Sequence, residues 1–253
     1  MSDRPAPATS PAIPALAPRL PVYLLLDVSR SMEGAPIEAL RQGVQLFARQ
    51  LAAQPHLRDR VWVRAITFAS SATAVTPDLV RCDRFTVPEL TLDGKTDRLD
   101  RALKTLQACM DVDTREAAAG PNAPLAPPVV LVFTNGQFTD GRGRLSQVVW
   151  RAEREAIVQR PPGGAAPAAI VPVGCGPAVA LDRLRELAFA VPPAADAGPP
   201  ELVVLGKDDV DFVALCTRAL DAPSAPVGAP LPPHGAPIAI DVHGAAWEVR
   251  FPP

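Results

Sequence analysis

The chain has 253 residues and a formal net charge of −2 at pH 7, with 48% hydrophobic and 21% charged residues. This length suits one large domain with a sizeable core, and the composition excludes a wholly disordered or fibrous chain. The charge excludes a broadly basic nucleic-acid binder, and no apolar run approaches the roughly 20 residues that cross a bilayer. Residues 1–19 lack an apolar centre, which indicates a flexible tail and predicts a cytoplasmic protein.

The cysteines are spread along the chain and form no recognisable ligand or disulfide pattern. They are Cys82, Cys109, Cys175 and Cys216. Because no two of them form a C-x-x-C pair, neither a zinc knuckle nor a disulfide framework is predicted. We expect core or surface thiols.

Apolar patterns typical of strands and helices alternate along the chain. Residues 22–26 form a fully apolar run, as in a strand covered on both faces, and residues 36–51 repeat apolar side chains at helical spacing. The predicted elements then continue in chain order: strand 61–68, an extended edge stretch at 73–80, helix 97–110, strand 129–133, helix 144–158, strand 168–173, helix 181–189, strand 202–205 and helix 209–220. Residues 117–128 are rich in alanine and proline and are predicted to form a connection.

Repeated strand–helix units predict the fold class. We expect an α/β fold with a doubly wound, mainly parallel central sheet, helices on both faces and one antiparallel edge strand. Ligands of such sheets bind beyond the carboxyl ends of the strands.

Polar side chains follow two of the predicted strands. Asp27, Ser29 and Ser31 come directly after the first strand, and Asn135 follows the strand at 129–133. Thr96 precedes the helix predicted at 97–110. Carboxylate, hydroxyl and amide oxygens are the hard ligands that Mg²⁺ or Mn²⁺ prefers, so these residues predict an ion site at one rim of the sheet.

Each of these residues also fits a purely structural interpretation. Asp27 and Ser29 can satisfy loop backbone groups, Thr96 can cap the helix that follows, and Asn135-Gly136 is a common turn pair. Their joint placement at one rim favours a binding site.

The segment 20–31, LPVYLLLDVSRS, resembles the first motif of the von Willebrand factor A family, in which an apolar strand leads into D-x-S-x-S. The likeness spans about residues 20–220 and is closest to the bacterial TerY-like branch. The later stretches that carry it occur in the family's order: residues 65–68, residues 85–92, Asp93-Gly94-Lys95-Thr96 and T-N-G-Q-F-T-D at 134–140.

The resemblance implies a Rossmann-like, non-enzymatic interaction module with a metal-ion-dependent adhesion site. It implies that Mg²⁺ or Mn²⁺ is held by Asp27, Ser29, Ser31, Thr96 and Asn135. The ion would bridge to an acidic residue of a protein partner. TerY-like proteins are associated with tellurium resistance and stress responses, and the implied partners are a PP2C-type phosphatase and a Ser/Thr kinase, with no nucleic acid and no membrane.

Two positions depart from the family pattern. Asn135 stands where the family has aspartate. Asp27 and Asn135 together therefore carry one negative charge instead of two, and they attract a cation less strongly. Lys95 replaces a small residue and would oppose a cation if it pointed inward. The carboxylates that could compensate are Asp93, Asp97 and Asp140, and the sequence does not choose among them.

Two other functions stay open. One is a metal-independent scaffold with a degenerate site. The other is a phosphohydrolase that uses Asp27 on a Rossmann-like sheet, but such phosphatases place a second carboxylate two residues later, where this chain has Ser29. Esterase and P-loop motifs are also absent from the sequence, so we expect no enzyme activity.

The predicted domain organisation has one principal unit. A tail at 1–19 precedes a von Willebrand factor A domain at 20–222, a proline-rich linker at 223–237 and a C-terminal β-hairpin segment at 238–253. An isolated hairpin is only marginally stable, so we expect it to pack on its own domain or to extend a partner's sheet.

Overall fold

A computed structural model describes residues 17–119, 123–146, 148–160, 165–189, 203–204 and 210–221. The predicted linker and C-terminal hairpin, and most of the predicted tail, lie outside these residues. The domain boundaries therefore stay a prediction.

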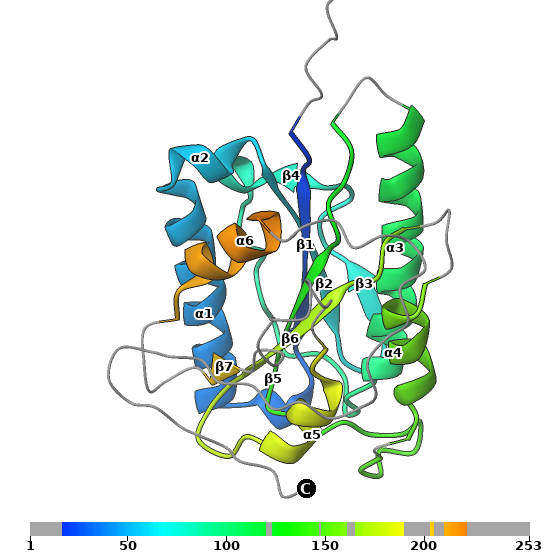
Figure 1. The fold of residues 1–253 in the computed structure, drawn as a ribbon. Coiled ribbons are helices and arrows are strands. Elements are labelled where there is room, and N and C mark those ends of the chain that lie inside the picture. The colour runs from blue at the N-terminus through cyan, green and yellow to red at the C-terminus, as the bar shows by residue number, and fades with distance from the viewer. Residues whose placement is uncertain are drawn as a thin grey trace, which may run out of the picture.

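A seven-stranded sheet lies at the centre of the described structure, in the order β3-β2-β1-β5-β6-β7, with β4 also pairing with β2 (Figure 1). The strands are β1 (Leu20–Asp27), β2 (Val61–Phe68), β3 (Ala72–Ala74), β4 (Val80–Arg81), β5 (Val129–Thr134), β6 (Ala169–Gly174) and β7 (Val203–Val204). All neighbouring pairs among β2, β1, β5, β6 and β7 are parallel, which confirms the predicted mainly parallel sheet.

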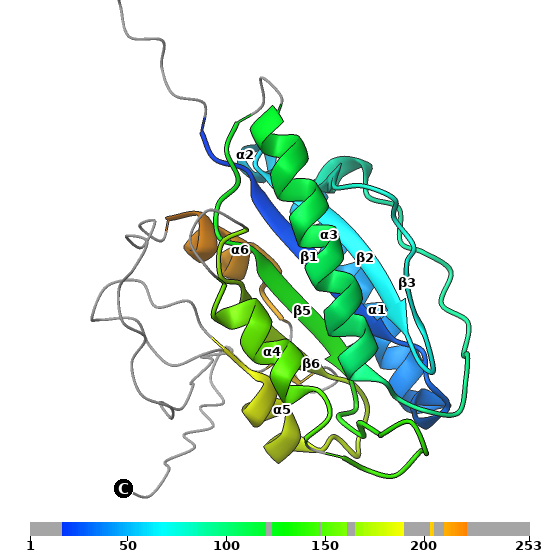
Figure 2. The ribbon, with the colours of Figure 1, turned by 90° about the vertical axis from the view of Figure 1, so that its right-hand side faces the viewer.

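Helices cover both faces of the sheet, as predicted. The helices and 3₁₀ turns are η1 (Arg30–Met32), α1 (Ala35–Ala52), α2 (Pro55–Arg58), η2 (Cys82–Arg84), α3 (Leu99–Ala119), α4 (Arg151–Val158), α5 (Leu181–Leu187) and α6 (Phe212–Asp221). Helices α1 and α6 lie on one face, and α3 and α4 lie on the other (Figures 1 and 2). Among the described residues, none of these helices is long and apolar enough to cross a membrane.

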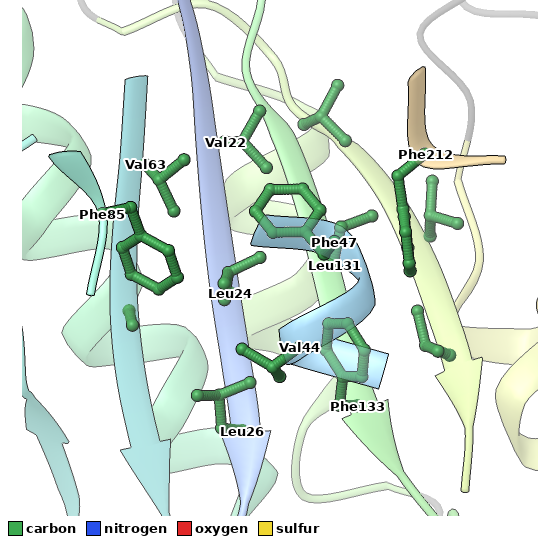
Figure 3. Packing of buried hydrophobic residues seen from close by; sticks show 14 of the residues in the cluster. Val22, Leu24, Leu26, Val44, Phe47, Val63, Phe85, Leu131, Phe133 and Phe212 are labelled. Atoms are coloured by element: carbon green, nitrogen blue, oxygen red, sulfur yellow. The ribbon is translucent and has the colours of Figure 1, made fainter. Parts of the chain in front are cut away.

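The core follows from the alternation of side chains along the strands. Leu24 and Leu26 of β1 point toward α1, where they join Val44 and Phe47 in one cluster (Figure 3). Leu25 points to the opposite face and belongs to the cluster under α3. β1 is buried over its whole length and pairs with β2 and β5, so its carboxyl end lies between two neighbouring strands at one edge of the sheet.

The antiparallel edge differs from the single strand that was predicted. It consists of β3 and β4, which pair with opposite ends of β2. Between them the Thr76 hydroxyl accepts a hydrogen bond from the backbone N–H of Ala65 at 2.6 Å, and Pro77 follows without an N–H of its own. The Ala65 carbonyl still accepts from the Val75 N–H at 2.9 Å, but its N–H binds a side chain instead of a backbone carbonyl, and the edge divides in two here.

Helix α3 begins two residues later than predicted and extends to Ala119, so the prediction of a connection was wrong for residues 117–119. Beyond Met110 the helix carries Asp113, which accepts hydrogen bonds from the sheet residues Tyr23 and Arg64. This tertiary anchoring and the high helix propensity of alanine explain the extra turns.

The helix predicted at 144–158 is also shorter, because α4 begins at Arg151. The preceding residues form a loop in which the Asp140 N–H donates to the Arg144 carbonyl and the Ser146 N–H donates to the Phe138 carbonyl. Gly143 has a φ of +76°, in the left-handed region that glycine tolerates. Leu145, near the start of the predicted helix, is 59% exposed.

Candidate functional site

The candidate site begins where β1 ends, at the carboxyl edge of the sheet. Asp27 is fully buried, and its Oδ1 atom accepts a hydrogen bond from the Ser29 N–H at 2.9 Å. Its Oδ2 atom accepts from the Thr134 hydroxyl at 2.6 Å. Because Thr134 ends β5, this contact joins the ends of two adjacent parallel strands.

The other residues after these strands form one hydrogen-bonded cluster. The Ser29 and Ser31 hydroxyls lie 3.1 Å apart. The side-chain amide of Asn135 donates to the Ser31 carbonyl at 2.8 Å and to the Ser31 hydroxyl at 3.2 Å. Ser31 is exposed, so the cluster runs from the buried Asp27 to the molecular surface. The structure thus brings together Asp27, Ser29, Ser31 and Asn135.

Thr96 has different partners. Its hydroxyl donates to the Ser70 hydroxyl at 2.9 Å, and the Ser70 oxygen also accepts from the Lys95 and Thr96 N–H groups. Ser70 follows β2, so these bonds tie the loop before α3 to the end of that strand. Within the described residues, no hydrogen bond joins the Thr96 side chain to Asp27 or Asn135.

The neighbouring residue, Asp97, was one of three open compensating candidates, and the structure places it beside Asp27. Asp97 is 2% exposed, and its carboxyl group lies within hydrogen-bonding reach of the Asp27 carboxyl group. No other group in the described part of the chain donates to either of its carboxylate oxygens. In contrast, Asp93 is exposed, and Asp140 binds the backbone N–H groups of its own loop.

Thr139 fixes the backbone of Asp97. The Thr139 hydroxyl accepts from the Asp97 N–H at 2.8 Å, and the Thr139 N–H donates to the Asp97 carbonyl at the same distance. Sequence reasoning did not single out Thr139 for this role. Its place in T-N-G-Q-F-T-D was visible, but its partner is 42 residues away along the chain.

The two neighbouring carboxyl groups perturb one another. Burial raises the pKa of Asp97 well above its usual range, and the charge of Asp27 and the hydrogen bond between the two groups add to this. Burial also raises the pKa of Asp27, although the hydrogen bonds from Thr134 and Ser29 act in the opposite direction. A carboxylate that is buried without donors is unfavourable unless a positive charge or a proton neutralises it.

The donor chemistry of this cluster fits a divalent cation. Carboxylate, hydroxyl and amide oxygens, which can all act as metal ligands, meet at one place. In the described structure, no hydrogen-bond donor contacts the buried carboxylate oxygens of Asp97. The described residues contain no group of three or more His, Cys, Asp and Glu side chains that could hold a metal. Any ion here would therefore need hydroxyl or amide oxygens beside the aspartates, as is common for Mg²⁺ sites that retain water.

No protein-family model matches the sequence, and a search of curated protein sequences found no significant match. Solved structures do match the fold. The von Willebrand factor type A protein from Catenulispora acidiphila aligns with 81% of this chain and 42% of its own, at 15% identity and a TM-score of 0.50. The pilus adhesin SpaC from Lactobacillus rhamnosus GG aligns with 81% of this chain and 30% of its own, at 14% identity and a TM-score of 0.52.

Proximal thread matrix protein 1 from the mussel byssus is similar over 81% of this chain and 47% of its own, at 12% identity and a TM-score of 0.51. This chain thus spans less than half the length of each of these three proteins. Such low identities show the fold alone. The chain has the Rossmann-like α/β fold of von Willebrand factor type A domains.

Proposed function

We propose that this chain is a non-enzymatic protein-interaction module, in which Asp27, Ser29, Ser31 and Asn135 hold Mg²⁺ or Mn²⁺ and dock an acidic residue of a protein partner. The observation that carries the proposal is the hydrogen-bonded convergence of these residues at the ends of β1 and β5. The occurrence of this fold in a pilus adhesin is consistent with a role in protein contact.

The charges around the rim support an acidic partner. The loop at 139–145 lies against the residue before Asp97, since a Cβ on Gly143 would lie 3.6 Å from the Thr96 side chain. Arg142 and Arg144 of this loop and Lys95 are exposed and form no ion pair in the described structure. Exposed cations beside an ion site attract an acidic surface and speed its encounter.

The state of Asp27 argues against its use as a nucleophile. It is fully buried, and both of its oxygens accept short hydrogen bonds from the chain itself. A nucleophile needs an oxygen that can reach the substrate. Asp27 is better suited to hold an ion or to order the loop after β1.

The motifs that resemble TerY-like proteins extend the proposal. We place the module in the cytoplasm, in a tellurium-resistance or stress-response system, with a PP2C-type phosphatase and a Ser/Thr kinase as the partners to test first. A metal-independent scaffold is the second candidate, because Asn135 supplies an amide where the family has a carboxylate, and this amide already binds Ser31.

Affinity purification of the tagged full chain from its native cells, with Mg²⁺ or with EDTA, tests the proposal. We expect one partner to be retained in Mg²⁺ and lost both with EDTA and in the variant Asp27→Asn. The matched control is Asp78→Asn, because Asp78 is exposed on the loop between β3 and β4. This variant should retain the partner.

Two outcomes contradict the proposal. Capture that survives EDTA and Asp27→Asn would favour the metal-independent scaffold. Phosphate-ester turnover that requires Mg²⁺ and disappears in Asp27→Asn would identify an enzyme instead.

A further inference from the structure

The loop before α3 presents two neighbouring oxygen-bearing side chains with opposite environments. The Thr96 hydroxyl is occupied by Ser70, at 2.9 Å. Asp97 is 2% exposed and faces Asp27, and neither of its carboxylate oxygens has a hydrogen-bond donor among the described residues. In this loop, the Asp97 carboxyl group therefore lacks a hydrogen-bond donor, whereas the Thr96 hydroxyl has a hydrogen-bond partner.

The backbone on both sides holds these orientations. Thr139 binds both the N–H and the carbonyl of Asp97. On the other side, the Arg98 N–H donates to the Ala69 carbonyl at 3.0 Å, next to Ser70. Turning Thr96 toward Asp27 in place of Asp97 would require the backbone to rotate here and would break these backbone hydrogen bonds, so the two side chains keep their separate orientations.

Among the residues that the structure describes, no cationic side chain forms an ion pair with Asp27 or Asp97. Arg183 is near enough for its charge to lower the pKa of Asp97, but its guanidinium donates to the Gly136 carbonyl at 3.3 Å. Among the described residues, Arg183 forms no ion pair with Asp97. Two buried carboxyl groups in contact need a shared proton or a cation between them.

We propose that the divalent cation at this rim is held by two carboxylates, those of Asp27 and Asp97, and that Thr96 is not a ligand. This inference rests on the function proposed above and assigns the second negative charge of its ion site. Asp97 supplies the negative charge that Asn135 lacks. The site therefore has two acidic ligands, although the second one comes from the loop before α3 and not from the end of β5. The hydroxyls of Ser29 and Ser31 and the amide oxygen of Asn135 complete the protein's share of the coordination.

Titration of the full chain with Mn²⁺, followed by calorimetry and by the electron paramagnetic resonance signal of free Mn²⁺, tests the assignment. The variant Asp97→Asn should weaken Mn²⁺ binding by at least about tenfold, because affinity depends on the charge of the ligand set. The variant Thr96→Val keeps the shape of the side chain but removes its hydroxyl. It should leave the affinity within about threefold of the wild type.

A charge-relocation variant provides the rescue. Because Asn135 and Asp97 bind the same ion in this proposal, Asp97→Asn combined with Asn135→Asp restores two carboxylates and should recover most of the lost affinity; no recovery would contradict the proposal. The matched control, Asp97→Asn combined with Thr91→Asp, adds the same charge at an exposed position before α3 and should recover none. If Asp97→Asn fails to fold, judged by circular dichroism, Asp97→Ser replaces it and carries the same expectation.

The outcomes separate this inference from the proposed function. Wild-type affinity in Asp97→Asn, together with a loss in Thr96→Val, would overturn the inference and leave the ion site standing with Thr96 as ligand. Wild-type affinity in both variants would also overturn it. Absence of Mn²⁺ binding by the wild type at millimolar ion would overturn the metal-dependent function and, with it, the ligand role of Asp97.

Discussion

At the scale of single residues, the chain buries aspartates in two different ways. Asp113 of α3 accepts hydrogen bonds from the Tyr23 hydroxyl at 2.8 Å and from the Arg64 guanidinium at 2.6 Å. Asp97 is as deeply buried but has no comparable donors in the described structure. The first arrangement stabilises the fold, whereas the second leaves a buried carboxyl group at the rim without hydrogen-bond donors among the described residues. The two aspartates therefore differ in their hydrogen-bond partners and not in their burial.

Removing Asp113 should therefore destabilise the protein strongly. We expect Asp113→Ala to lower the free energy of unfolding by about 3–5 kcal/mol, because the Arg64 charge is left buried without its partner. Tyr23→Phe removes one hydrogen bond and should cost about 1 kcal/mol. Urea denaturation followed by circular dichroism measures both changes.

The control for this prediction is the ion pair between Asp182 and Arg185, in which the Asp182 side chain is 96% exposed. Asp182→Ala should change the free energy of unfolding by less than about 1 kcal/mol. Equal losses in Asp113→Ala and Asp182→Ala would show that the buried network contributes nothing specific.

The sequence predicted part of the rim, and the reason for the remainder is physical. Asp27, Ser29 and Asn135 directly follow apolar strands, so the parallel sheet alone brings them to one edge. Thr96 and Asp97 are adjacent, and local pattern cannot say which of them faces inward. That choice depends on Ser70 and Thr139, whose contacts with this loop span 26 and 42 residues.

At the scale of elements, the alternation of strands with helices along the chain and the mainly parallel sheet were predictable, whereas several boundaries were not. The buried strands β1 and β5 are mostly apolar runs, and such runs are recognised as strands from the sequence alone. The ends of α3 and α4 depend on other parts of the molecule. One helix is extended by contacts between Asp113 and the sheet, and the other is shortened by the loop that returns from Arg144 to Asp140.

Gly94, in the loop before α3, provides a test of how tightly Ser70 packs against this loop. This glycine has a φ of +67°, and a Cβ built on it would lie 2.4 Å from the Ser70 hydroxyl oxygen. Gly94→Ala combines left-handed strain of about 1–2 kcal/mol with displacement of Ser70, so we expect a total loss of about 2–4 kcal/mol in the free energy of unfolding. Urea denaturation measures the loss.

Gly34→Ala is the matched control, because Gly34 has a φ of +83° and its Cβ would meet nothing within 4 Å. Gly34 has a ψ of −129°, so this variant reports the strain of a positive φ alone, about 1–3 kcal/mol. Losses of the same size in Gly34→Ala and Gly94→Ala would mean that Ser70 does not hold the loop tightly.

At the scale of the whole molecule, the described helices close a core on each face of the sheet. Phe212 of α6 packs edge-on against Phe47 of α1, with ring centroids 5.3 Å apart. Gln50 of α1 accepts a hydrogen bond from the Phe212 N–H at 2.9 Å and donates one to the Val210 carbonyl at 2.8 Å. The beginning of α6 is therefore fixed by both polar and apolar contacts, and the cluster that it covers is closed to solvent.

The reactivity of the cysteine thiols measures whether the core on each face of the sheet stays closed to solvent. All of them are buried free thiols, with Cys82, Cys175 and Cys216 in the cluster under α1 and α6 and Cys109 in the cluster under α3. Burial raises the pKa of the Cys82 thiol to about 11. The thiolate is the reactive form, so at pH 8 only about a thousandth of this group would react even if a reagent reached it.

We therefore expect the native chain to react slowly with an aromatic disulfide reagent at pH 8, and all four cysteines of the sequence to react at once in concentrated denaturant. Stopped-flow absorbance measures both rates. Because Cys109, at 6% exposure, is the most accessible of the four, it should be the first to react in mild denaturant. A rapid phase of one thiol equivalent in the native protein would contradict the prediction, because it would require one face of the sheet to open without global unfolding.

Phe212→Ala provides the internal check. This variant removes the ring that covers the cluster containing Cys216, so it should speed the labelling of that cluster. Cys109 lies on the opposite face and should keep its wild-type rate.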